Sequence, residues 1–356
     1  MKKDYNEYFP RLYDFQNLYK AHLKARKGKR TKREVVNFEI NLSSNLVKLS
    51  QSLRDGTYSI SGYYSFLVFE PKKREIHALH YVDRVVQHCL CDEILEPVLD
   101  KRLIYDNAAC RKEKGTHFAL KRVTHFLTDY YRKNKTNEGY FLKCDIRKFF
   151  DSIDHEILKQ KLTSIFVDTN LLNFLFKIID SYHTSPNKGI PMGNQTSQWF
   201  AIFYLDELDR IIKEKLSIKY YVRYMDDFLL ISSNKESLSS NLKFITWYLS
   251  KNLKLELNAK TQIIPMKNGV NFLGFHFYIL ETGKIIKKVS QQTKKKFKRR
   301  ILSFVRRYSD FKVSYDEIYP SYVSMFAHLE HGTTYQLATN LSQKAIFRRK
   351  YFEKKF

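Results

Sequence analysis

The sequence predicts an α+β fold in which short strands present acidic residues and basic helices flank them. Residues 222–232 place Asp226 and Asp227 between apolar runs rich in aromatic and β-branched side chains, which indicates two buried strands joined by a tight turn. Another strand-like run ends at Asp145. Residues 189–201 combine two glycines with a following helical pattern of apolar residues, which predicts a loop that opens a helix.

The charge of the chain points to a polyanionic partner. The 356 residues carry a formal net charge of +26, far more than solubility requires, so nucleic acid is the leading candidate. A hydrophobic fraction of 43% and an aromatic fraction of 15% exclude a merely basic disordered tail. No apolar run approaches the length of a membrane span, and the first residues lack the apolar segment of a signal peptide. We therefore expect a folded cytoplasmic protein that does not enter a membrane.

The acidic residues predict a site for a divalent metal ion. Carboxylates beside an apolar core are costly unless a cation compensates them, and oxygen ligands suit Mg²⁺. An ordinary Asp-Asp turn would explain Asp226 and Asp227 alone, but Asp145 at the end of another strand adds a third carboxylate. The backbone carbonyl of Ile146 could join the same metal.

Two basic segments precede Asp145 in the chain. Residues 1–65 are expected to be helical and basic, and residues 66–69 and 76–79 are expected to form a hairpin with Arg74 and either Lys72 or Lys73 at its tip. A guanidinium at such a tip can fork onto a triphosphate.

Three further expectations concern single segments. Arg111, in the basic loop 109–117, is the expected nucleic-acid contact of that region. Thr196 or Ser197 is the expected cap of the helix after the glycine loop. Beyond residue 284, Lys and Arg alternate with apolar residues on expected helices, whose basic face is either simply solvated or lies along phosphates.

The order of these motifs resembles the palm of reverse transcriptases. A strand ending in Asp, a glycine loop opening a helix, and a Tyr-Met-Asp-Asp hairpin follow one another in that family, and the resemblance covers residues 66–276. It implies an RNA-directed DNA polymerase with a right-hand fold, in which two Mg²⁺ ions, or Mn²⁺ in their place, are held by the three aspartates. The implied segments are a basic helical extension (1–65), fingers (66–140), a palm with part of the fingers inserted (141–280) and a helical thumb (281–356).

The same resemblance assigns further roles. Arg74 would clamp the triphosphate, Phe150 would reject a ribose 2′-hydroxyl, and Lys260 would lie near the leaving pyrophosphate. The full set assigned to the nucleotide is Lys73, Arg74, Phe150, Met192, Gly193, Gln198 and Lys260. The set assigned to primer and template is Arg111, Tyr224, Phe272, Leu273 and Gly274.

Within that family, the motifs look most like the enzymes of diversity-generating retroelements. The similar stretches are Gly193-Asn-Gln-Thr-Ser-Gln198, Glu70-Pro-Lys72, Asp83-Arg-Val-Val-Gln-His88 and Ala109-Cys-Arg111. Met192 replaces a glutamine that contacts the incoming nucleotide, and losing that amide removes hydrogen-bonding discrimination. The resemblance therefore implies error-prone cDNA synthesis, particularly opposite template adenine. It also implies a structured template RNA, dNTPs and a small basic accessory protein as partners.

Other functions remain open. An anti-phage defence reverse transcriptase would use the same palm with a dedicated non-coding RNA or without a template. A non-catalytic RNA-binding protein could retain the palm as a scaffold, although a scaffold has no physical need for three acids. An intron-encoded enzyme is less favoured, because little chain remains after the thumb for splicing or cleavage domains.

Overall fold

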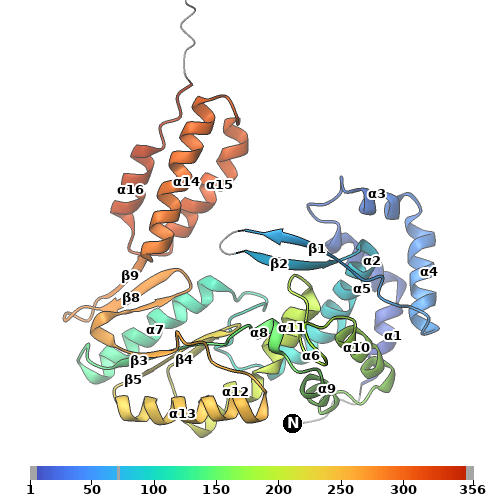
Figure 1. The fold of residues 1–356 in the computed structure, drawn as a ribbon, viewed down its shortest axis with the longest axis horizontal. Helices are drawn as coiled ribbons and strands as arrows, with labels where there is room; N and C mark the ends of the chain where they lie inside the picture. The colour runs from blue at the N-terminus through green and yellow to red at the C-terminus, as the bar shows by residue number, and fades with distance from the viewer. Residues whose placement is uncertain (1–5, 70–72, 350–356) are drawn as a thin grey trace, which may run out of the picture. The chain divides into compact units, whose positions relative to one another are not determined.

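The computed structural model describes residues 6–69 and 73–349 (Figure 1). Internal contacts divide the chain into two compact units. Unit 1 comprises Met1–Gly115, Cys144–Phe228 and Ser240–Thr261, and unit 2 comprises Thr116–Lys143, Leu229–Ser239 and Gln262–Phe356. The segment boundaries expected near residues 65, 140 and 280 stay predictions. No helix of the described ranges is long and apolar enough to span a membrane.

Unit 1 begins with the helices expected for the N-terminal segment. They are α1 (Phe9–Tyr13), α2 (Phe15–Ala25), α3 (Arg33–Ile40) and α4 (Leu42–Arg54). Leu18, Ala21 and Ala25 are buried at helical spacing, so α2 has one apolar face, which packs against α5 (Tyr81–Leu90). The Asp14 carboxylate caps α2 by accepting from the backbone N–H of Asn17 at 2.9 Å.

A two-stranded hairpin follows these helices in the chain. Strands β1 (Tyr63–Val68) and β2 (Arg74–Leu79) are antiparallel, with Val68 opposite Arg74. The side chains of β1 are largely exposed, and β2 buries only Leu79 at its end. The predicted hairpin is therefore confirmed, and Arg74 lies exposed at the end where the two strands are connected, opposite Val68.

Most other helices belong to unit 1. They are η1 (Cys91–Leu95), α6 (Glu96–Leu99), η2 (Asp100–Arg102), α8 (Phe149–Ser152), α9 (His155–Thr163), α10 (Thr169–Asp180), α11 (Gln195–Tyr204), α12 (Asp206–Arg210) and η3 (Ile211–Lys215). Helix α7 (Thr116–Asn134) lies in unit 2, and α13 (Lys235–Asn252) runs from unit 2 into unit 1. Residues 199–204 of α11 are all buried, so this helix forms part of the core.

The central sheet carries the predicted acids. It contains β3 (Tyr140–Asp145), β4 (Tyr221–Tyr224), β5 (Asp227–Ser232) and β6 (Gln262–Pro265), in the order β4-β5-β3-β6. Residues 228–231 of β5 are buried without alternation, as expected for a strand covered on both faces. Because Asp145 ends β3 and Asp227 begins its neighbour β5, the sheet itself brings the acids toward one another.

Unit 2 contains a smaller sheet and the C-terminal helices. Strands β7 (Val270–Phe272), β8 (Phe275–Ile279) and β9 (Ile285–Val289) pair antiparallel after the short turn η4 (Met266–Asn268). Helices α14 (Gln291–Ser309), α15 (Tyr315–Glu330) and α16 (Tyr335–Lys344) then pack on one another as a bundle (Figure 1). Helix α14 buries Phe297 and Ile301 and exposes most of its basic residues, so the expected amphipathic basic helix is present.

Candidate active site

The Tyr-Met-Asp-Asp hairpin has the predicted form. Strand β4 ends at Tyr224 and β5 begins at Asp227, which leaves Met225 and Asp226 as a two-residue turn. Met225 adopts a left-handed backbone with φ of 55°, a costly conformation for a residue with a side chain. Its carbonyl accepts a hydrogen bond from Nη1 of Arg223 at 2.9 Å, which helps to hold the turn.

Backbone hydrogen bonds join Asp145 to that turn. The N–H of Ile146 donates to the carbonyl of Asp226 at 3.2 Å, and the N–H of Asn258 donates to the carbonyl of Asp145 at 2.7 Å. Ile146 also forms a β-bridge with Leu257. Residues from three distant parts of the chain thus fix where Asp145 and Asp226 lie.

The electrostatics show that the acids influence one another. Burial raises the pKa of Asp226, and the charge of Asp145 raises it further, while Arg74 and Arg223 act in the opposite direction. Burial also raises the pKa of the neighbouring Cys144 thiol, with additional contributions from Asp227 and Asp145. The three carboxylates therefore share one region of unit 1.

The donor set is chemically suited to a divalent cation. Carboxylate and carbonyl oxygens are the ligands that Mg²⁺ prefers. Burial and, to a lesser extent, the charge of Asp145 raise the pKa of Asp226, and a bound cation would offset both effects. Across the described ranges, no group of three or more His, Cys, Asp or Glu side chains is already arranged as a metal site. Asp145, Asp226, Asp227 and the Ile146 carbonyl are the residues that would hold the ion after adjustment of their side chains.

The glycine loop lies against the β1–β2 hairpin. Gly193 has a φ of 111°, and a Cβ atom placed there would lie 2.9 Å from Cγ2 of Ile76 on β2. Helix α11 begins at Gln195 with Asn194 as its N-terminal flanking residue, so the expected capping role of Thr196 or Ser197 is wrong. Thr196 instead donates from Oγ1 to Oε1 of Gln87 at 2.9 Å, which ties the buried start of α11 to α5.

Phe150 lies next to this loop. Its carbonyl accepts from the N–H of Ile190 at 2.9 Å, two residues before Met192. The Phe150 ring is half-buried and meets the Phe149 ring edge-on, with centroids 5.8 Å apart. Lys148, with a φ of 45°, turns the chain from the acid-bearing strand into α8. This backbone hydrogen bond thus holds Phe150 beside the segment that leads to Met192.

The predicted phosphate-binding cations are exposed. Lys73, Arg74 and Lys260 all lie on the surface of unit 1, and Arg74 is close enough to Asp226 to affect its pKa. The N–H of Lys260 donates to Oδ1 of Asn258, and the N–H of Asn258 donates to the carbonyl of Asp145. Asn258 thus connects the backbone of Lys260 to that of Asp145. Met192 and Gln198 are half-buried on either side of Gly193.

Comparison with protein families identifies the family of the chain. Residues 70–277 match the family described as reverse transcriptase (RNA-dependent DNA polymerase), and this range includes the three acids and the glycine loop. The chain belongs to the reverse transcriptase family. The α+β right-hand polymerase fold expected from the sequence is confirmed, since both larger sheets pair antiparallel and lie among helices.

Curated relatives of this reverse transcriptase are intron-encoded proteins. The chain is 23% identical over 372 residues to the group II intron-encoded protein LtrA of Lactococcus lactis subsp. cremoris, covering 80% of the chain and 59% of that protein. It is 23% identical over 200 residues to the putative COX1/OXI3 intron 2 protein of Saccharomyces cerevisiae, covering 38% of the chain and 23% of the relative. The chain therefore spans about three fifths of LtrA.

Solved structures similar to the chain include telomerases. Apo telomerase from Candida tropicalis, truncated from its C-terminal domain, has a TM-score of 0.49 and 15% identity, covering 69% of this chain and 60% of the other. Telomerase from Candida albicans in complex with a fragment of telomeric RNA has a TM-score of 0.48 and 11% identity, covering 86% and 64%.

The structure contradicts the nucleic-acid contact predicted for Arg111, and one predicted motif lies outside the described residues. The Arg111 side chain is only 7% exposed, and its guanidinium donates to the Asp100 carboxylate and to the carbonyls of Ile104 and Asn107. A structural role thus replaces the nucleic-acid contact expected for Arg111, because these bonds already occupy its donors. Glu70-Pro-Lys72 lies outside the described residues.

Three residues assigned to primer and template, Phe272, Leu273 and Gly274, lie in a hairpin of unit 2. Phe272 pairs with Phe275, and Leu273 and Gly274 form the two-residue turn with φ values of 47° and 84°. Phe272 is buried, whereas Gly274 is exposed. Tyr224, the other expected primer contact, lies half-buried at the end of β4 in unit 1.

One important pair was missed by the sequence reading. Arg223 on β4 and Asp209 on α12 are fully buried and form an ion pair, with Nη2 and Oδ2 2.6 Å apart. A charged residue on an otherwise apolar strand is the signal that could have identified Arg223, but nothing in the sequence specifies its partner.

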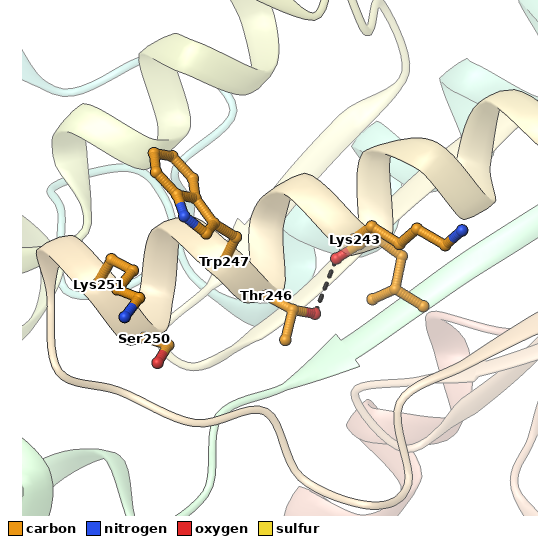
Figure 2. Close-up of a pocket in the computed structure, with 6 residues that line it drawn as sticks. Lys243, Thr246, Trp247, Ser250 and Lys251 are labelled. Atoms are coloured by element: carbon orange, nitrogen blue, oxygen red, sulfur yellow. Dashed lines mark hydrogen bonds between the residues drawn. The ribbon is translucent and has the colours of Figure 1, made fainter.

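A surface hollow on helix α13 is lined by residues other than those of the predicted site. It occupies about 450 Å³ beside Trp247, with Lys243 and Lys251 one helical turn before and after it (Figure 2). None of the predicted site residues lines it. The hollow is therefore a separate surface feature, and the acids are not part of it.

Proposed function

We propose that this chain is an RNA-directed DNA polymerase that extends a primer 3′-hydroxyl with dNTPs on an RNA template. The single observation that carries the proposal is the hydrogen bond from Ile146 N–H to the Asp226 carbonyl. It fixes the ends of two acid-bearing strands beside each other in a chain of the reverse transcriptase family.

The residues of the site have distinct roles in this reaction. Asp145, Asp226 and Asp227 would hold two divalent ions, Mg²⁺ or Mn²⁺, with help from the Ile146 carbonyl. When bound, such ions lower the pKa of the attacking hydroxyl and stabilise charge on the leaving pyrophosphate. The protein mainly positions the reactants, since phosphoryl transfer depends on alignment and charge stabilisation.

The nucleotide would be held by residues around the glycine loop. Exposed Lys73, Arg74 and Lys260 offer cations for the triphosphate, and Arg74 already lies near Asp226. The half-buried Phe150 ring, beside the segment that leads to Met192, supports its proposed role in rejecting a ribose 2′-hydroxyl. Tyr224 and the Phe272–Gly274 hairpin would contact the primer.

The template is proposed to be a structured RNA of a diversity-generating retroelement, copied with errors at adenine. Met192 in place of an amide and the Gly193–Gln198 motif support this subtype. A small basic accessory protein would assist. A defence reverse transcriptase with a dedicated RNA is the alternative. Because the curated relatives are intron-encoded proteins, an intron RNA is a third template to test.

The experiment is primer extension on RNA with Mg²⁺, followed by sequencing of the products. Wild type should extend the primer and Asp226→Asn should not, while Trp247→Ala, on the separate α13 surface, serves as the control that retains activity. Errors concentrated at template adenines would support the retroelement subtype, and accurate copying would contradict it. Absence of extension with wild type on retroelement, defence and intron RNAs would overturn the proposed polymerase.

A further inference from the structure

The guanidinium of Arg223 is a buried connector beside the acidic turn. It lies on β4, three residues before Asp226, and its side chain is fully buried. Nε donates to Oδ1 of Asp209 at 2.7 Å, and Nη2 donates to Oδ2 of the same carboxylate at 2.6 Å. This two-pronged contact fixes the plane of the guanidinium and balances its charge.

The remaining donors of Arg223 reach two backbone carbonyls. Nη2 also donates to Ile202 near the end of α11, at 2.9 Å, and Nη1 donates to Met225 in the acidic turn, at 2.9 Å. One rigid planar group thus joins the turn that carries Asp226 to the helix that follows the Gly193 loop.

The surroundings of Asp209 hold this connector in place. The hydroxyl of Tyr221, on the same face of β4 as Arg223, donates to Oδ1 of Asp209 at 2.6 Å. The backbone of Arg223 is bonded as well: its N–H donates to Asp106, and its carbonyl accepts from Ala108. The position of the guanidinium is therefore determined from several sides.

The bond to Met225 matters because of the conformation of that residue. Met225 has a φ of 55°, which places the following carboxylates but is unfavourable for a side-chain-bearing residue. A fixed donor at its carbonyl stabilises this conformation. Without it, we expect Met225 to relax and the Asp226 carboxylate to move from its place beside Asp145.

We propose that Arg223 is a positioning residue, which, clamped by Asp209, sets the acidic turn in the geometry that binds the catalytic metal ions. The inference rests on the proposed polymerase function but concerns metal affinity, which can be measured without catalysis. Residues that orient metal ligands typically change metal affinity or activity by about 10–100-fold when replaced.

The test compares Arg223→Lys with wild type. Lysine keeps the charge but lacks the planar fork, so it cannot reach Asp209, Ile202 and Met225 together. Mn²⁺ binding to the protein alone, followed by electron paramagnetic resonance, should weaken by about 10–100-fold. The Mg²⁺ concentration that gives half-maximal primer extension should rise in parallel.

The matched control is Lys161→Met. Lys161 forms another nearly buried ion pair in unit 1, with Asp206 on α12 at 3.2 Å. The hydrogen bonds of its ammonium group go to Asp206 and Glu207, and not to the acidic turn. This variant should lose stability in a thermal melt yet retain wild-type Mn²⁺ affinity. Equal loss of Mn²⁺ affinity in both variants would mean that destabilisation alone is responsible, and would overturn the inference.

A second variant guards against misfolding of the first. Asp209→Asn keeps the shape of the clamp and removes its charge, so it should weaken Mn²⁺ binding in the same direction. Unchanged Mn²⁺ affinity in a folded Arg223→Lys or Asp209→Asn protein would overturn the proposal. Wild type that binds Mn²⁺ but extends no primer would count against the polymerase function only.

Discussion

Asp226 accepts a backbone hydrogen bond from Ile146, the residue that directly follows Asp145, at 3.2 Å. The bond holds two carboxylate-bearing residues together although burial and, to a lesser extent, the charge of Asp145 raise the pKa of Asp226 and disfavour its charged form. Two carboxylates held this close should lower the stability of the metal-free protein but favour binding of a metal ion. Active sites often lower folding stability in this way.

Asp226→Asn should therefore separate activity from stability. We expect primer extension to fall by about 10²–10³-fold or more, because an electrostatic contact in the transition state is lost. The melting temperature measured without divalent ions should stay the same or rise. The neutral asparagine avoids the cost of burying a charged carboxylate and its repulsion by Asp145. A marked drop in melting temperature would show that the carboxylate supports the fold instead.

Gly193→Ala should impair nucleotide binding. The new Cβ would lie 2.9 Å from Cγ2 of Ile76, and the alanine would keep a φ of 111° that is unfavourable for a residue with a side chain. Such a conformation costs about 1–3 kcal/mol. We expect a higher KM for dNTPs in steady-state extension, because the loop must move away from the hairpin. Gly56→Ala is the control: its φ is also positive, at 69°, but nothing lies within 4 Å of the new atom. A similar KM change in both variants would refute a specific role of the loop.

Met192→Gln should reduce errors opposite template adenine. The introduced amide can hydrogen-bond where the methionine thioether offers only a weak acceptor, so correct and incorrect pairs differ more in energy. Sequencing of cDNA should show several-fold fewer substitutions at adenines. Met192→Leu, which adds no hydrogen-bonding group, should retain the wild-type error spectrum, and equal spectra in all three proteins would contradict the assigned role.

Protonation of histidines should destabilise unit 2 at low pH. The His328 ring lies between Phe275 and Phe297, with centroids at 4.8 Å and 5.7 Å, and the rings of His117 and His331 stack at 3.5 Å. Burial lowers the pKa of His328, and His117 and His331 lower it further. The charged groups that also act on His331 are Lys287, Lys121 and Glu330.

The sign of this effect follows from the lowered pKa. Above the ordinary histidine pKa of about 6.5 both the folded and unfolded states are neutral at this residue, so its stabilising contribution is complete. As the pH falls below that value the unfolded chain binds protons first, and stability is lost. Thermal melts from pH 8 to pH 5 should show a shallower pH dependence for His328→Gln than for wild type, which contains other histidines. Identical slopes would rule out this contribution.

Helix α14 should account for part of the salt dependence of nucleic-acid binding. Lys295 and Arg299 are exposed and one turn apart on that helix. Replacing both with alanine should reduce the slope of log K against log salt concentration by about one unit per lost phosphate contact. The comparison is Lys243→Ala with Lys251→Ala on α13, two exposed lysines beside Trp247. Equal reductions would show that charge, and not the position of α14, is responsible.

Local patterns were sufficient to predict the acid-bearing elements. The turn between Tyr224 and Asp227 and the strand ending at Asp145 follow from apolar residues that directly flank the acids. The glycine loop also leads into a helix as predicted, and Gly193 has a positive φ there. Such features depend on a few adjacent residues, so the sequence contains nearly all the information that determines them.

The partners of buried polar groups were decided by the tertiary structure. Arg111 was expected to contact nucleic acid but binds Asp100, and Arg223, which the sequence did not single out, binds Asp209. Thr196 likewise bonds Gln87 instead of capping its helix. A buried donor must find an acceptor wherever packing places one, and that choice depends on segments far apart in the chain. The sequence by itself determined which residues could do the chemistry, and only the tertiary structure decided which polar side chains hold them in place.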